Sequence, residues 1–69
     1  MSRGKVKEYD SNRGYGCIID SDTGESLTVY ANYVDSEIGE TLQEGQSVEY
    51  EIEYHRNENW AVYVRIVSA

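Results

Sequence analysis

The 69-residue chain contains no proline or phenylalanine, only one cysteine and one histidine, and no long run of apolar residues. A single cysteine excludes an intramolecular disulfide and any zinc site built from several cysteines, and it favours a reducing compartment. The apolar runs are too short to span a membrane, and residues 1–5 lack the apolar centre of a signal peptide. We therefore expect a cytoplasmic protein with no membrane partner, cofactor or metal.

Basic charge is also scarce. The chain carries 13 acidic and 6 basic residues, for a net charge of −7, which argues against a general polyanion binder. The basic residues are unevenly placed: residues 1–18 hold four basic and two acidic side chains, whereas residues 19–69 hold two and eleven. Most of the acids are expected to keep a small domain soluble. The basic excess lies beside the glycine-containing stretch of residues 13–18.

Alternating apolar residues predict five short strands, over residues 4–10, 15–20, 27–31, 46–54 and 60–67. The clearest alternation is in 46–54, where Val48, Tyr50, Ile52 and Tyr54 alternate with serine and three glutamates. We expect Tyr50 and Tyr54 to face the core and the glutamates to face solvent. The same reasoning puts Trp60, Val62, Val64 and Ile66 on one side of the last strand, and Ala61, Tyr63, Arg65 and Val67 on the other.

The arrangement of the strands predicts an all-β fold. Three strands joined by tight turns are followed by a long connection over residues 32–45, in which we expect one helical turn, with Val34 and Leu42 against the core. Two further strands complete a five-stranded antiparallel barrel of the OB type, in one domain over residues 1–69. Closing the sheet removes edges that would invite aggregation. An SH3-like barrel is the main alternative.

The stretch Arg13-Gly14-Tyr15-Gly16-Cys17-Ile18 is the clearest candidate for a binding site. Glycine permits positive φ angles and close approach of a ligand to the backbone. A tyrosine between two glycines at the start of a strand can present its ring to a nucleic-acid base. A tight hairpin with one half-exposed tyrosine is the alternative reading.

Three blocks resemble the cold-shock domain family in order and spacing: residues 4–7, 13–18 and 42–48. The second block resembles the family's first ribonucleoprotein motif, and Leu27-Thr28-Val29-Tyr30 occupies the place of the second. The resemblance implies a five-stranded OB-type barrel that binds single-stranded RNA or DNA on an aromatic, basic face. The nucleic-acid-binding residues are then expected to be Tyr15, Tyr30 and Trp60, which would stack on bases, and Lys5, Lys7, Arg13 and Arg56, which would contact phosphates.

The chain departs from the family pattern at several stacking positions. Glu8 replaces a tryptophan, and Cys17 and Thr28 replace phenylalanines, while Tyr30 replaces a histidine. Each stacked base is worth ~1–3 kcal/mol, so the loss of about three rings predicts binding weaker by ~10²-fold or more. Glu8 adds repulsion toward phosphate. We therefore expect weak binding of single strands.

The composition bears on two other classes of function. The net charge and the missing rings would suit a repurposed acidic OB-type barrel that acts as a protein-interaction module with a basic partner. An enzyme is disfavoured because Cys17 has no base placed beside it. His55 lies in a polar turn and is interpreted as a solvated loop residue. We expect no catalytic residues, and a monomer.

Overall fold

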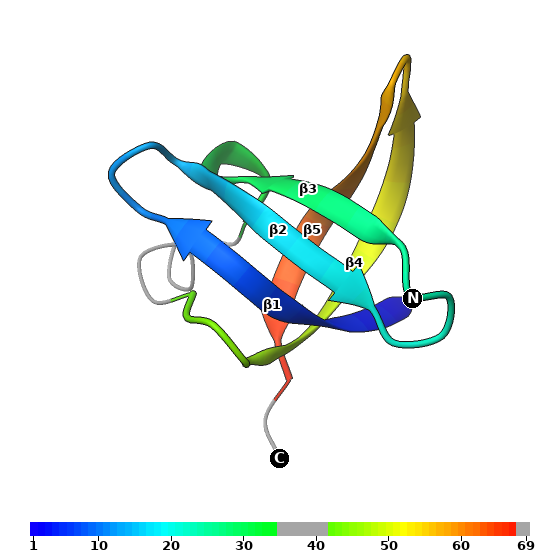
Figure 1. The fold of residues 1–69 in the computed structure, drawn as a ribbon, viewed down its shortest axis with the longest axis horizontal. Coiled ribbons are helices and arrows are strands. Elements are labelled where there is room, and N and C mark those ends of the chain that lie inside the picture. Colours follow the sequence, from blue (N-terminus) through cyan, green and yellow to red (C-terminus); the bar gives the residue numbers. More distant parts are fainter. Residues whose placement is uncertain (35–41, 68–69) are drawn as a thin grey trace.

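β-Branched and aromatic residues alternate with polar ones along five segments, and each segment forms a strand. The computed structural model describes residues 1–34 and 42–67. Its elements in chain order are β1 (Ser2–Asp10), β2 (Tyr15–Asp20), β3 (Ser26–Tyr30), the 3₁₀ helix η1 (Ala31–Tyr33), β4 (Ser47–His55) and β5 (Glu58–Ile66). Figure 1 shows β1, β2 and β3 crossing in front of β4 and β5. In the described part of the chain, no helix has the length and apolar character needed to cross a membrane.

The strands close into a barrel in the order β1-β2-β3-β5-β4, with β4 paired back to β1. Four of the pairings are antiparallel, and β3 pairs with β5 in parallel. An odd number of strands cannot alternate in direction all the way around a ring, so at least one neighbouring pair must be parallel. The predicted five-stranded barrel is confirmed, with a mixed rather than a purely antiparallel orientation.

The core fills the barrel with side chains from all five strands. Tyr50 is its largest fully buried residue, as the alternation in β4 predicted. Its hydroxyl donates a hydrogen bond to Asp20 Oδ2 at 2.7 Å. The other carboxylate oxygen of Asp20 accepts from the backbone N–H groups of Asp22 at 2.8 Å and Thr23 at 3.0 Å. The buried carboxylate therefore joins the core to the β2–β3 turn.

A bulge in β5 overturns the predicted faces of that strand. The register moves from Glu51↔Val62 to Glu49↔Arg65, so β5 carries one extra residue opposite Tyr50. Trp60 and Val62 therefore share the face that carries Glu51 and Glu53 on β4, although Val62 itself is fully buried. Ala61 lies instead on the core side with Val64 and Ile66, so the bulge divides the predicted even-numbered face. An extra residue reverses the alternation beyond it, which a strict period of two cannot anticipate.

The expectation that Tyr54 faces the core is wrong. The β4–β5 hairpin extends past the rest of the barrel (Figure 1), and Tyr54 lies on this extension with 76% of its surface exposed. Alternation alone cannot show where a strand extends beyond the neighbouring strands that would cover its inner face. The predicted anchors of the long connection are confirmed, because Val34 and Leu42 are both buried. One helical turn is present as η1, while residues 35–41 lie outside the described part.

Candidate nucleic-acid interface

Five rings meet on the outside of the barrel and form what we call the aromatic cluster: Tyr15, Tyr30, Tyr33, His55 and Trp60. The ring centroids of Tyr15 and Tyr30 are 6.2 Å apart, and those of Tyr30 and Trp60 are 4.8 Å apart. Trp60 also contacts Tyr33, at 5.6 Å, and is stacked with His55 at 3.7 Å. The rings therefore form a continuous surface, in which the indole is the central member.

Strand pairing places these rings together. Tyr15 at the start of β2 lies directly opposite Tyr30 at the end of β3. The parallel pairing of β3 with β5 sets Thr28 opposite Trp60, two residues from Tyr30 on the same face. Tyr15 is 42% exposed and Tyr33 is 41% exposed, so the cluster offers ring surface to solvent. Such faces can hold unpaired bases by stacking.

Two glycines fix the position of Tyr15. Gly14 has φ +81°, which favours glycine, and its carbonyl oxygen accepts a hydrogen bond from the N–H of Ala31 at 2.8 Å. At Gly16, a Cβ would collide with the carbonyl oxygen of Glu8 and lie 2.7 Å from the Cα of Tyr9. The predicted reason for the two glycines holds in part: one permits the turn, and the other permits close approach of β1.

An open hollow of about 700 Å³ adjoins the cluster. Glu8, Cys17 and Thr28 lie side by side across it, as successive partners on β1, β2 and β3. None of these side chains has a ring. The part of the face where the family pattern would place three aromatic residues is therefore a depression without rings. Tyr15 and Tyr30 lie along one margin of it.

Acidic groups surround the hollow, which is lined by Glu8, Asp10 and Glu58. Glu58 Oε2 accepts a hydrogen bond from the Thr28 hydroxyl at 2.9 Å. Arg13 is the basic residue of the hollow; its Nε lies 3.7 Å from Asp10 Oδ2 and its Nη1 donates to Tyr15 Oη at 3.3 Å. The contact with Tyr15, followed by the charge of Asp10, raises the pKa of the Arg13 guanidinium. The cation is thus held beside a ring of the cluster.

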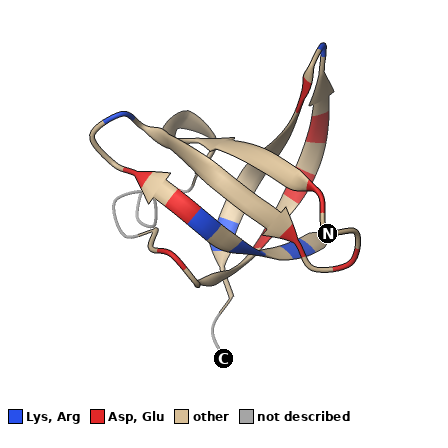
Figure 2. Ribbon diagram, viewed as in Figure 1, with Lys and Arg blue, Asp and Glu red and all other residues tan. Residues whose placement is uncertain are grey.

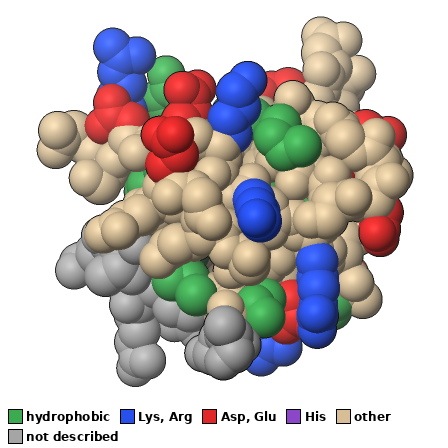
Figure 3. All heavy atoms as spheres, turned by 60° about the horizontal axis from the view of Figure 1, so that its bottom comes forward, with side chains coloured by type: hydrophobic (Ala, Val, Ile, Leu, Met, Phe, Trp, Pro, Cys, Tyr) green, Lys and Arg blue, Asp and Glu red, His purple; other side chains and the backbone are tan. Residues whose placement is uncertain are grey.

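Charges of both signs are dispersed over the part of the chain that the structure describes. Figure 2 shows basic positions on β1 and at the tips of the β1–β2 and β4–β5 hairpins, with acidic positions between them. The space-filling view in Figure 3 shows basic side chains separated from one another across one face, with acidic side chains mainly toward its edges. This pattern gives no broad positive surface on the face in view.

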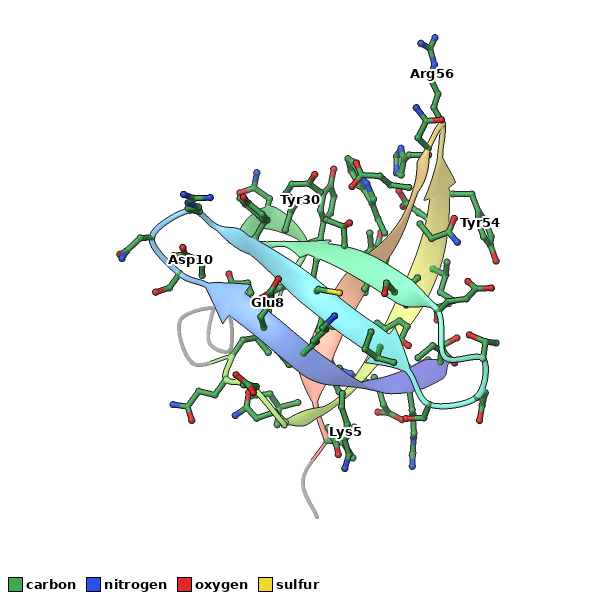
Figure 4. The ribbon with its side chains drawn as sticks, in the orientation of Figure 1. Lys5, Glu8, Asp10, Tyr30, Tyr54 and Arg56 are labelled. Atoms are coloured by element: carbon green, nitrogen blue, oxygen red, sulfur yellow. The ribbon has the colours of Figure 1, made fainter. Side chains whose placement is uncertain are left out.

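The structure brings together only part of the predicted set of binding residues. Tyr30 contacts both Tyr15 and Trp60, and Arg13 adjoins Tyr15. Figure 4 shows Lys5 at the opposite edge of the barrel from Tyr30, and Arg56 at the tip of the projecting hairpin. Lys7 is exposed at a bulge in β1 between Val6 and Glu8.

His55 and Tyr33 belong to the cluster but were not predicted as members of it. His55 lies on β4, not in the turn, and its Nε2 is 3.1 Å from Glu53 Oε1. The sequence held a usable signal: continuing the alternation of Glu49, Glu51 and Glu53 places residue 55 on their face. A two-residue hairpin loop then sets that residue diagonal to Trp60. Tyr33 lies in η1, and its ring joins the cluster through Trp60.

A small closed barrel with stacked rings and a cation on its outer face belongs to the class of OB-type nucleic-acid-binding modules. The sequence model of the 'Cold-shock' DNA-binding domain matches residues 2–67. The chain is similar to a cold shock-like protein of Thermotoga maritima, with 42% identity over 66 residues covering 96% of this chain and 98% of that protein.

Two further relatives agree with this match. Cold shock protein CspB of Bacillus caldolyticus is 40% identical over 52 residues, which cover 75% of this chain and 77% of that protein. Protein lin-28 of Caenorhabditis briggsae is 35% identical over 54 residues, which cover 78% of this chain and 23% of that longer protein. The chain belongs to the cold-shock domain family, a family of proteins that bind single-stranded nucleic acids.

The described residues offer little for other chemistry. Among them, no group of three or more histidine, cysteine, aspartate or glutamate side chains is arranged to hold a metal ion. Cys17 is half-buried on the face of the hollow, where it replaces a ring. The arrangement is suited to binding a flat, apolar ligand group beside a cation.

Proposed function

We propose that this protein binds single-stranded RNA or DNA through the aromatic cluster, with Tyr15, Tyr30 and Trp60 as base-stacking residues and Arg13 as the first phosphate contact. The observation that supports this proposal is the contact between three predicted stacking residues, contributed by β2, β3 and β5. A ring surface of this kind requires unpaired bases, so single strands are preferred to duplexes.

The binding is weak compared with that of a barrel bearing the full set of rings. Glu8, Cys17 and Thr28 provide no platform in the centre of the face, and Glu8, Asp10 and Glu58 repel phosphate there. A bound strand therefore follows the margin formed by the cluster. Lys5 and Arg56 point away from that margin (Figure 4) and contact phosphates only of a strand that extends beyond it. Lys7, which precedes Glu8 on β1, contacts phosphate beside the hollow.

The remaining features of the proposal follow from the family and the composition. We propose a cytoplasmic, monomeric, one-domain protein without catalytic activity, whose partner is a nucleic acid. A basic protein partner is the competing possibility, and the experiment below separates the two.

The test is a titration with oligo(dT) and oligo(U) at low salt, followed through the fluorescence of Trp60, the single tryptophan. Binding quenches the indole, and Tyr15→Ala weakens the affinity by about tenfold. Tyr54→Ala is a matched control because Tyr54 is exposed away from the cluster (Figure 4). A flat titration for the parent protein, with recovery of a basic protein after nuclease treatment, would overturn the proposal in favour of a protein partner.

A further inference from the structure

A second hollow begins where the aromatic cluster ends. This hollow, which we call the β5 groove, measures about 430 Å³. It lies between the segment around η1 and the outer face of β5, and its lining includes Tyr33, Glu53, Tyr63 and Arg65. Tyr33 belongs to both sites: its ring contacts Trp60 at 5.6 Å, and it also lines the groove. The groove therefore continues the surface proposed to bind nucleic acid.

The backbone at Tyr63 is unusual. It has φ +53°, and it is the one non-glycine residue with positive φ among the described residues. A bulky residue in this region is strained by about 1 kcal/mol or more. The bulge itself is needed, because it returns Val64 to the core, but glycine or asparagine would suit the same backbone better.

The side chain of Tyr63 is equally unexplained by folding. Its surface is 72% exposed, so the ring adds little to the core. Strain and exposure together at one residue are the kind of outlier that indicates a functional role. The ring lines the β5 groove together with that of Tyr33.

A cation is available in the same groove. Arg65 is exposed and lines it, and its Nη2 donates a hydrogen bond to the sulfur of Met1 at 3.7 Å, which leaves its charge without an acidic partner among the described residues. The acid directly opposite on β4, Glu49, is bound instead by Arg3, with Arg3 Nη2 at 3.1 Å from Glu49 Oε2. Glu53 also lines the groove, but its carboxylate is engaged by His55 Nε2 at 3.1 Å. The groove thus combines two rings with a guanidinium.

The geometry points to the β5 groove as a second subsite for the same single strand, occupied by nucleotides that continue past Trp60. Tyr63 supplies a stacking face and Arg65 a phosphate contact. This inference rests on the proposed function, because the strand must first occupy the aromatic cluster. Tyr33, shared by the two sites, is the residue over which the strand passes.

The test compares oligo(dT) of about four and about eight nucleotides, within the range of site sizes of OB barrels, against the parent and Tyr63→Gly. Glycine relieves the positive φ, so the variant is expected to remain folded, which its thermal melt verifies. We expect an unchanged affinity for the short strand and a five- to tenfold loss for the long one. Tyr63→Phe, which keeps the ring, retains the parent affinity, and Arg65→Gln reduces the salt slope for the long strand by about 0.7.

The possible failures are distinguishable. If the parent binds the short strand but Tyr63→Gly binds both lengths as the parent does, the β5 groove inference is overturned and the proposed function stands. An equal loss at both lengths also overturns it. If the parent binds neither length, the proposed function fails and the inference fails with it. Self-association abolished by Tyr63→Gly, without any effect on nucleic-acid binding, would assign the groove to a second copy of the chain and overturn the inference.

Discussion

The imidazole of His55 is stacked on the indole of Trp60, with ring centroids 3.7 Å apart and planes inclined by 29°. The two residues come from opposite arms of the β4–β5 hairpin, at diagonal positions of its register. Glu53 lies directly opposite Trp60, and its Oε1 is 3.1 Å from Nε2 of the His55 imidazole. The stack therefore orders the arm of the hairpin that supports the indole.

Removing this stack is expected to loosen Trp60. His55→Ala should lower the free energy of unfolding by about 0.5–1 kcal/mol, the value of an aromatic pair, and shift the tryptophan emission to longer wavelength as water reaches the indole. Urea denaturation and emission spectra measure the two effects. His55→Phe keeps a ring in place and should resemble the parent. An unchanged emission maximum and stability in His55→Ala would show that the stack contributes nothing.

Restoring a ring in the hollow should strengthen binding. Cys17 is the middle member of the row formed with Glu8 and Thr28, and its side chain lines the hollow. Cys17→Phe adds a stacking platform worth ~1–3 kcal/mol per base, so the affinity for oligo(dT) should rise about tenfold. Fluorescence titration measures the gain, and Cys17→Ser, which adds no ring, should show none. Equal affinities for the two variants would mean that the strand does not cross this part of the face.

Neutralising Glu8 should strengthen binding by a different route. Its carboxylate is exposed in the hollow, and Glu8→Gln removes a repulsion toward phosphate without adding a ring. The gain is expected to be about two- to fivefold at low salt and to vanish near 1 M salt, where charges are screened within about 3 Å. Titrations over a series of salt concentrations measure it. Glu44→Gln, an exposed substitution outside both hollows, is the control, and a gain that persisted at high salt would contradict a charge effect.

The barrel is predicted well because each strand is recognised from residues that are close together in the sequence. Alternation identified the five strands and the buried Tyr50. The failures are non-local: one bulge opposite Tyr50 reversed the faces of β5, and Tyr54 lies where the hairpin has outrun the barrel. Both depend on how strands meet their neighbours, which residue type and spacing do not encode.

The candidate site was predictable where the residues lie within one motif. Tyr15 and Arg13 follow from a single stretch, and Tyr30 from its place in the next strand. His55 and Tyr33 join the cluster only through Trp60, so their membership depends on the pairing of β3, β4 and β5. Lys5 illustrates the opposite case, since it lies at the far edge of the barrel from Tyr30 (Figure 4). Arg56 follows His55 in the sequence, but its side chain points outward from the tip of the hairpin.

Acid should destabilise the fold through Asp20. Its carboxylate accepts hydrogen bonds from the Tyr50 hydroxyl and from the backbone of Thr23 and Asp22. These bonds, that of Tyr50 first, lower the pKa of Asp20. A group whose pKa is lower in the folded than in the unfolded state contributes stability above the unfolded value, near pH 4, and loses it as the pH falls through the folded value. The free energy of unfolding of the parent should therefore drop below about pH 4 relative to that of Asp20→Asn, as measured by urea denaturation at a series of pH values. Asp22→Asn, at an exposed neighbour, should follow the parent; if the Asp20→Asn curve also ran parallel to the parent, the buried carboxylate would not be the acid-sensitive group.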